Sequence, residues 1–241
     1  MDDGKQIPDA AEQKQETASS ARMILAMGAI GTLSAILLVA TYITTLPAIE
    51  RNRAEALERA IFEVLPGAGS KTTFASIDGR MQPVADDHEA RPKYYAGYDE
   101  EGHLVGLAVE AKGPGFQDTL KVLYGYSPEC SCIVGLKVLE TKETPGLGDK
   151  IETDPAFVAN FQALDVSLDP AGVAAANPLV LVKPGQKTEA WQVEGITGAT
   201  ISSRAVTRIL RASSAQSVAV IENNLEVFNR GRIDEPTEKT Q

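Results

Sequence analysis

The longest apolar stretch of the chain lies near its N-terminus, between charged residues. No Asp, Glu, Lys or Arg occurs from Met23 to Ile49, and Arg22 and Glu50 border the stretch. A helix needs about 20 predominantly apolar residues to cross a bilayer. The pattern therefore predicts one transmembrane helix over residues 22–48. A cleaved signal peptide is the alternative, but its apolar region is usually only about 7–15 residues long.

The surroundings and direction of this segment stay open. Gly28, Gly31 and Ala35 could let a neighbouring helix pack closely, or they could simply face lipid. Three basic residues lie within residues 1–22 and three within residues 51–59. The bias toward positively charged cytoplasmic flanks therefore gives no orientation.

The segments on either side of the span differ in pattern. Residues 1–21 are polar and lack aromatic side chains, which predicts a disordered tail. Apolar residues at helical spacing predict an amphipathic connecting helix over residues 49–65, ended by Pro66 and Gly67. We expect one soluble domain over residues 66–233 and a charged tail over residues 234–241.

Within residues 66–233, short alternating runs come before a long helical pattern. Helical spacing of apolar residues predicts a helix over residues 201–228, and a shorter helix is expected over residues 154–162 with Pro155 in its first turn. Several non-repeating strands with helices at the edges indicate an α+β fold with a mixed or antiparallel sheet. Strands are expected at residues 94–98, 104–109, 120–126, 133–139, 179–182 and 190–193.

Composition limits the chemistry. The net charge is −10 and the pI about 4.8, with no cluster of Lys and Arg, so we expect no nucleic-acid partner. Two cysteines and two histidines are too few for a metal or iron–sulfur site within this chain. Cys130 and Cys132 are separated by one residue, which is too close for an ordinary structural disulfide. We expect buried thiols at a strand end; ligands shared with a partner subunit are the alternative.

One hydroxyl-rich segment lies where a strand gives way to a helix: Thr197-Gly198-Ala199-Thr200-Ile201-Ser202-Ser203. Hydroxyl side chains favour helix N-termini, where they satisfy free N–H groups. The same end of a helix attracts anions, and small residues let a phosphate approach the backbone. The pattern fits a phosphate site or a capped helix without a ligand.

A second segment, Glu143-Thr144-Pro145-Gly146-Leu147-Gly148-Asp149-Lys150, predicts a turn. Pro145-Gly146 suits the central positions of a type II turn, and Gly148 adds a second conformationally permissive position. Such a loop could bring its backbone against a flat ligand, or it could be an ordinary turn.

Together the two segments resemble the FMN-binding domain of the G subunit of the Rnf-type ion-translocating oxidoreductase, and of the related C subunit of the sodium-pumping NADH:quinone reductase. The resemblance implies that FMN is joined through a phosphoester to Thr200 by a separate flavin transferase outside the cytoplasm. Residues 1–21 would then be cytoplasmic, and residues 66–233 would lie on the periplasmic side of the bacterial inner membrane. In that family an aspartate usually stands where this chain has Glu194. The longer side chain could weaken recognition by the transferase, but we still expect modification.

The resemblance also assigns neighbours to the flavin. Thr197, Gly198 and Ala199 would surround its phosphate, and Ser202 and Ser203 would bond the phosphate or cap the helix. The ring would lie against Gly146, Leu147 and Gly148. Glu143, Thr144 and Lys150 are candidate contacts or, alternatively, solvated turn residues. No residue of this chain is predicted to be catalytic, because the flavin would supply the redox chemistry.

The implied function is an electron-relay subunit of a membrane-bound ferredoxin:NAD oxidoreductase complex that moves ions. Its partners would be the other subunits, the transferase and the lipid bilayer. This subunit would not itself bind NAD, because no Gly-x-Gly-x-x-Gly pattern follows a strand. A membrane-tethered structural module without redox activity is the alternative. A flavoprotein that regulates another respiratory pathway usually has more membrane spans than this chain.

Overall fold

The computed structural model describes residues 10–86, 88–89 and 92–230. The chain divides into two compact units, residues 1–55 and residues 56–241.

Helix α1 (Ala10–Val64) contains the apolar stretch. Its portion from Ser20 onward is long and apolar enough to cross a membrane, with a mean hydropathy of 2.3 in its most apolar window. Thr41, Thr44 and Thr45 donate hydroxyl hydrogen bonds to carbonyls one turn earlier, which satisfies these groups within the helix.

Two expectations about the ends of this helix need correction. α1 begins at Ala10, inside the predicted disordered tail, because the residues from Ala10 to Glu16 are all strong helix formers. The connecting helix is also not separate, since α1 continues through Pro47 to Val64. The other predictions for residues 1–9 and 231–241, including the charged tail, lie outside the described residues.

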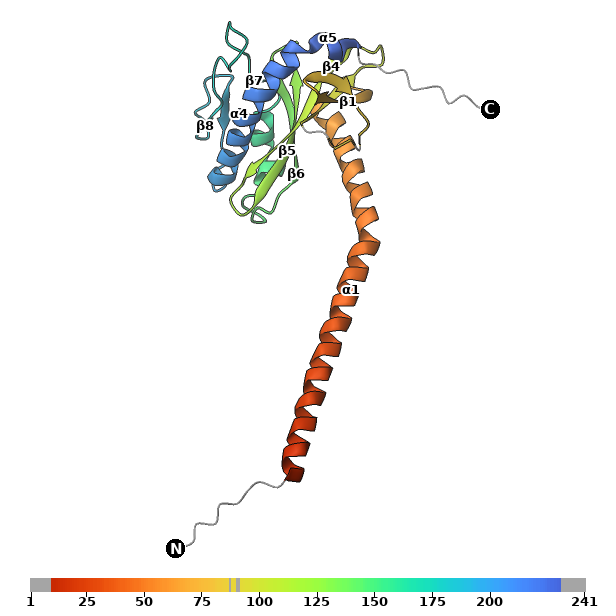
Figure 1. The fold of residues 1–241 in the computed structure, drawn as a ribbon. Coiled ribbons are helices and arrows are strands. Elements are labelled where there is room, and N and C mark those ends of the chain that lie inside the picture. The colour runs from red at the N-terminus through yellow and green to blue at the C-terminus, as the bar shows by residue number, and fades with distance from the viewer. Residues whose placement is uncertain (1–9, 87, 90–91, 231–241) are drawn as a thin grey trace, which may run out of the picture. The chain divides into compact units, whose positions relative to one another are not determined.

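The second unit is built on a seven-stranded antiparallel sheet in the order β2-β1-β3-β4-β5-β6-β7 (Figure 1). The predicted strands that enter it are confirmed, with longer bounds. The α+β class is confirmed as well. The strands are β1 (Ser70–Ile77), β2 (Arg80–Pro83), β3 (Lys93–Tyr98), β4 (Leu104–Pro114), β5 (Thr119–Ser127), β6 (Cys132–Glu140) and β7 (Leu164–Asp165).

The β1–β2 hairpin was not predicted, although its turn has a sequence signal. Asp78 and Gly79 both have positive φ, 51° and 75°, and they form the two-residue connection between the strands. Asp-Gly is a favoured pair for a two-residue hairpin turn in which both residues have positive φ.

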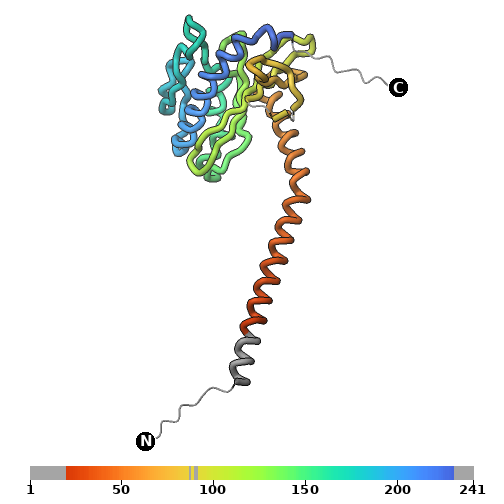
Figure 2. The backbone as a smooth tube through the Cα atoms, viewed as in Figure 1, coloured from red at the N-terminus to blue at the C-terminus, as the bar shows by residue number. Residues whose placement is uncertain are grey.

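Alternation along the strands sends side chains to two apolar cores. On one face, Tyr94 of β3 and Val122 of β5 join the core with helix α4 (Thr200–Asn223). On the other face, Tyr95 and Leu123 pack with the end of α1, where Ile61 is buried. Figure 2 shows the α4 backbone running along the sheet. The residues of α1 from Ala56 onward therefore belong to the folded domain, which starts ten residues earlier than expected.

Glycines let the end of α1 lie against the sheet. Gly97 faces Gly106 across β3 and β4, and Gly125 faces Gly135 across β5 and β6. A Cβ on Gly125 would lie 2.0 Å from the carbonyl oxygen of Val64. Side chains at these positions would prevent the helix end from packing.

The remaining elements connect the sheet to α4. Asp154 caps α3, its Oδ1 accepting from Phe157 N at 3.0 Å, with Pro155 in the first turn as predicted. The helical pattern at the C-terminus is broken at Asn224, so it forms two helices. These elements are α2 (Lys150–Thr153), α3 (Pro155–Ala159), the parallel pair β8 (Val180–Val182) and β9 (Gln192–Glu194), and α5 (Leu225–Arg230).

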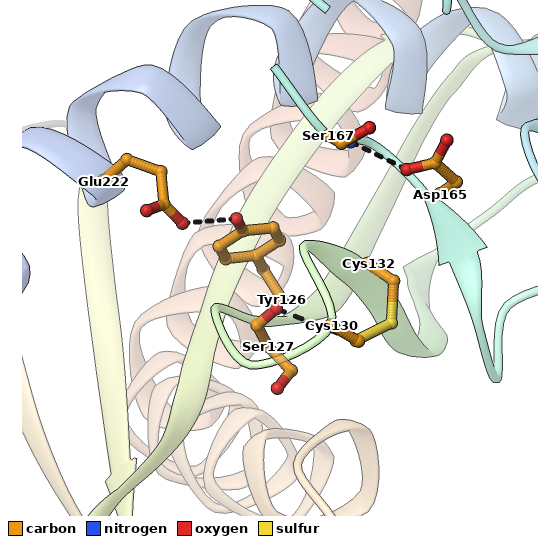
Figure 3. Close-up of a disulfide and its surroundings, with 7 residues drawn as sticks. All are labelled: Tyr126, Ser127, Cys130, Cys132, Asp165, Ser167 and Glu222. Carbon is orange, nitrogen blue, oxygen red and sulfur yellow. Dashed lines mark hydrogen bonds between the residues drawn. A yellow bond between two sulfur atoms is a disulfide. The ribbon is translucent and has the colours of Figure 1, made fainter. Parts of the chain in front are cut away.

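The expectation of free thiols at Cys130 and Cys132 was wrong, because the two residues form a disulfide (Figure 3). Their Cα atoms are 5.1 Å apart, within the usual range for a disulfide. Ser131 makes this possible, because its positive φ of 52° folds the chain back between the two cysteines.

Candidate functional site

Helix α4 begins at the hydroxyl-rich segment, with Thr200 as its first residue. Ser203 N donates to Ala199 O at 3.0 Å, which is the first hydrogen bond of the helical pattern. The N-cap residue is Ala199, whose side chain cannot accept a hydrogen bond, so the helix has no side-chain cap. The amides of residues 200–202 therefore have no intrahelical acceptor, which leaves this end open to an anion.

The predicted role of Ser203 in this segment differs from the structure. Ser203 does not cap the helix: its hydroxyl accepts from Ile196 N at 3.1 Å and donates to Ala199 O at 2.9 Å. Because Ser203 is fully buried, it holds the turn before α4 and cannot reach a ligand at the surface. Gly198 has a φ of 87°, so its glycine is needed for the backbone conformation.

Glu143 is buried, with 6% of its surface exposed, and it links three segments. Its Oε1 accepts from the backbone N–H of Phe116 at 2.6 Å, and its Oε2 accepts from the Ser202 hydroxyl. The structure thus brings together the two predicted segments, but through a carboxylate that holds the loops rather than one that faces solvent.

The second segment forms the predicted turn. Leu147 N donates to Thr144 O at 3.1 Å, and Gly146 at the third position has a φ of 77°. Gly148 has a different role from the one expected. Its φ is not positive, and a Cβ there would lie 2.7 Å from Glu143 Oε2 and 2.9 Å from Ser202 Oγ. The glycine is needed for close packing around Glu143.

The loop between β4 and β5 was not predicted to contribute, and it completes the site. Besides the Phe116–Glu143 bond, Gln117 Nε2 donates to Thr144 Oγ1 at 2.8 Å. Lys142 donates to Asp118 and holds the pKa of that carboxyl below its usual value. Three consecutive residues of the loop are therefore tied to the segment that contains Glu143. The sequence feature that could have indicated this loop is Phe116, an aromatic residue directly after Gly-Pro-Gly.

These elements enclose a surface cleft of about 330 Å³, here called the Thr200 cleft. Three large apolar side chains at the cleft are exposed: Phe116 at 59%, Leu147 at 52% and Ile201 at 54%. We call them the apolar rim. Apolar side chains gathered around a few polar groups are typical of a ligand site. The cleft is lined by Phe116, Glu143, Thr144, Leu147, Gly148, Gly198, Ala199, Thr200, Ile201 and Ser202.

Four predicted site residues do not line the Thr200 cleft: Gly146, Lys150, Thr197 and Ser203. Lys150 and Thr197 line a neighbouring cleft of about 490 Å³ together with Glu194. The carboxylate of Glu194 accepts from the backbone N–H of Gly185, so it holds the loop after β8. Glu194 therefore has a structural role in this chain.

A larger cleft, about 1020 Å³, runs along α4 beside residues 175–181. Arg204, Arg208 and Arg211 line it, but it contains none of the predicted site residues. The Thr200 cleft is smaller, and among these three clefts it combines open amides, an exposed threonine and exposed apolar side chains.

Comparison with known proteins identifies a domain family within the second unit. Residues 115–214 match the FMN-binding domain family. The G subunit of the ion-translocating oxidoreductase complex from Methanosarcina acetivorans is 35% identical over 192 residues, covering 80% of this chain and 91% of the relative. The chain belongs to this family of G subunits.

Further matches support the assignment and the fold. The G subunit of the Na⁺-translocating ferredoxin:NAD⁺ oxidoreductase complex from Acetobacterium woodii is 31% identical, covering 74% of this chain and 82% of the relative. The crystal structure of NqrC from Shewanella oneidensis has a TM-score of 0.57 at 20% identity, covering 74% of this chain and 98% of that one. At that identity the likeness concerns the fold alone.

The matched region covers the Thr200 cleft and only part of the sheet. Residues 115–214 include every residue of the Thr200 cleft, from Phe116 to Ser202. They leave out the four strands β1 to β4. This G subunit thus contains an FMN-binding domain, and the strands before it extend the sheet.

Proposed function

We propose that this chain relays electrons within a membrane-bound ion-translocating ferredoxin:NAD oxidoreductase complex, through FMN esterified to Thr200. Membership of the G-subunit family and the FMN-binding domain support an electron-transfer subunit. The observation that supports Thr200 most directly is its position: an exposed hydroxyl at the first residue of α4, inside the cleft of the matched domain.

The residues of the cleft fit both ends of a flavin nucleotide. The open amides at the start of α4 suit a phosphate, and the helix dipole favours negative charge there. The apolar rim, which lines the same cleft, suits a flat aromatic ring. When bound, the flavin supplies redox chemistry that protein side chains lack.

Each cleft residue then has a definable task. The Thr200 hydroxyl donates a long hydrogen bond of 3.4 Å to Ile196 O, so esterification would remove only a weak hydrogen bond. Ser202 is buried and its hydroxyl donates to Glu143. It would therefore stabilise the cleft and not bind the phosphate. Phe116 and Leu147 would cover the ring from two loops that Glu143 and Gln117 hold together.

The proposed cellular arrangement follows the family resemblance. The apolar part of α1 would cross the bacterial inner membrane once, with residues 66–233 on the periplasmic side. A flavin transferase would modify Thr200 there. The other subunits of the complex and the lipid bilayer would be the lasting partners.

The test compares Thr200 with an exposed threonine outside the hydroxyl-rich segment. The full chain is purified from membranes of the native host, as wild type, as Thr200→Ala and as the matched control Thr188→Ala. We expect the wild type and the control to give a fluorescent band on a denaturing gel and an intact mass increased by one FMN residue. Thr200→Ala should lose both.

Two outcomes would contradict the proposal. An unmodified wild-type chain from the native host would favour a membrane-tethered structural module without redox activity. A fluorescent Thr200→Ala chain would move the attachment to another residue.

A further inference from the structure

The turn between β5 and β6 contains a disulfide that encloses one residue. Cys130 and Cys132 have a sequence separation of 2. The stabilisation that a disulfide gives by restricting the unfolded chain grows with the number of residues it encloses. This disulfide joins no distant segments, so support of the fold does not explain it.

The turn is held by other interactions. Cys132 is paired with Ser127 on β5 and with Asp165 on β7. Val166 N donates to Ser131 O at 3.1 Å, and the hydroxyl of Tyr126, which precedes the turn, donates to Glu222 Oε1 at 2.5 Å. The backbone around the cysteines therefore has partners that do not depend on the sulfur–sulfur bond.

Closing so small a ring has a conformational cost. Ser131 has a φ of 52°, a left-handed conformation that residues with a side chain rarely adopt. Asp78, the other non-glycine residue with positive φ among the described residues, lies in an Asp-Gly hairpin turn that favours it. A serine has no such preference, so opening the disulfide would let this residue relax.

The two sulfurs differ in access. Cys130 is exposed, whereas Cys132 has 5% of its surface exposed. Figure 3 shows the disulfide beside the turn, with Cys130 close to Ser127. Sγ of Cys130 lies 3.8 Å from the Ser127 carbonyl oxygen, which could accept a hydrogen bond from the Cys130 thiol once the disulfide is reduced.

We propose that Cys130 and Cys132 form a reversible thiol–disulfide exchange site whose substrate is a small free thiol. The thiolate attacks Sγ of the exposed Cys130, which forms a mixed disulfide, and the Cys130–Cys132 bond breaks. Cys132 leaves as a thiolate and takes up a proton. A second small thiol then attacks the small-thiol sulfur of this mixed disulfide. Cys130 is released as a thiol, and the two small molecules leave joined by a disulfide bond. Two thiols thus supply two electrons and two protons to the protein.

This site lies away from the Thr200 cleft. β5 has nine residues between the loop that contains Phe116 and the turn that contains the cysteines. At about 3.3 Å per residue, the strand separates the two sites by roughly 25–30 Å. The exchange site therefore does not depend on the proposed flavin, and it can be tested whether or not Thr200 is modified.

The experiment uses the full chain in detergent, without denaturant. The protein is incubated with increasing ratios of reduced to oxidised glutathione, and free thiols are alkylated and counted by intact mass. We expect two thiols to appear together while circular dichroism and the melting temperature stay unchanged. A disulfide that opens only when the protein unfolds would overturn the proposal, as would two free thiols in the untreated protein.

Single-cysteine variants test the order of attack. Cys132→Ser leaves the exposed sulfur and should form a glutathione adduct with oxidised glutathione at least about tenfold faster than Cys130→Ser, which leaves the buried one. Equal rates in two variants with unchanged circular dichroism would contradict the proposed attack at Cys130.

Discussion

The carboxylate of Glu143 accepts a hydrogen bond from the hydroxyl of Ser202, which follows it by 59 residues. The same carboxylate accepts from Phe116 N at 2.6 Å. One buried side chain therefore sets the distance between the start of α4, the Thr144–Leu147 turn and the β4–β5 loop. A Cβ on Gly115 would lie 2.4 Å from Glu143 Oε1, and Gly148 is similarly close, so two glycines make room for it.

Removing the Ser202 hydroxyl should destabilise the domain. In Ser202→Ala the buried carboxylate loses one donor, and hydrogen bonds to charged groups contribute about 1.5–3 kcal/mol. We expect the free energy of unfolding, measured with urea, to fall by about that amount. Ser76→Ala, an exposed serine on β1, should change it by less than about 0.5 kcal/mol. Equal effects in the two variants would show that the Glu143–Ser202 bond contributes little.

The apolar rim should matter for the flavin and not for the fold. Phe116 is exposed, so Phe116→Ala should change the free energy of unfolding by less than about 0.5 kcal/mol. In the flavinylated protein it should change the flavin fluorescence and increase its quenching by iodide, because the ring loses part of its cover. Val173→Ala, an exposed apolar residue outside the Thr200 cleft, is the control. Unchanged fluorescence in Phe116→Ala would remove this residue from the flavin contacts.

Gly125 of β5, which lies against the end of α1, gives a prediction about packing. Gly125→Ala would place a Cβ 2.0 Å from Val64 O, where only backbone movement can relieve the contact. Overpacking of this kind costs about 1–3 kcal/mol. Gly69→Ala is the control, since the nearest atom to its Cβ would be 4.0 Å away. Thermal unfolding of both variants measures the difference, and a Gly125→Ala protein as stable as the control would contradict the predicted clash.

Alkaline pH should destabilise the domain through its buried tyrosines. Burial raises the pKa of Tyr124 to about 12, above its usual value of 10. The unfolded chain releases this proton first, so the stabilisation is complete below pH 10 and is lost as the pH rises toward 12. The free energy of unfolding should therefore fall across this range.

The Tyr124→Phe variant should show a shallower fall. Part of the slope should remain, because burial also raises the pKa of Tyr98 to about 12. The variant also loses the Tyr124–Ser213 hydrogen bond, so only the slope and not the absolute stability is compared. The same slope in both proteins would mean that Tyr124 does not titrate in this window.

Several features were predictable because they depend on neighbours within a few residues. The apolar stretch of α1, the turn at Pro145-Gly146 and the position of Thr200 at a helix start all follow from local pattern and turn chemistry. The Asp78-Gly79 pair is also a local signal for the β1–β2 hairpin, but the strand prediction did not include this hairpin.

Only the tertiary structure decided which of these segments meet. The sequence alone determined a membrane-length helix, an alternating sheet pattern and a hydroxyl at the start of α4, because hydropathy and turn preferences act along the chain. It could not show that Glu143 binds Ser202, that Phe116 completes the cleft, or that Thr197 and Lys150 line another one. Those relationships join residues far apart in sequence, and they depend on how α4 and the loops pack against the sheet.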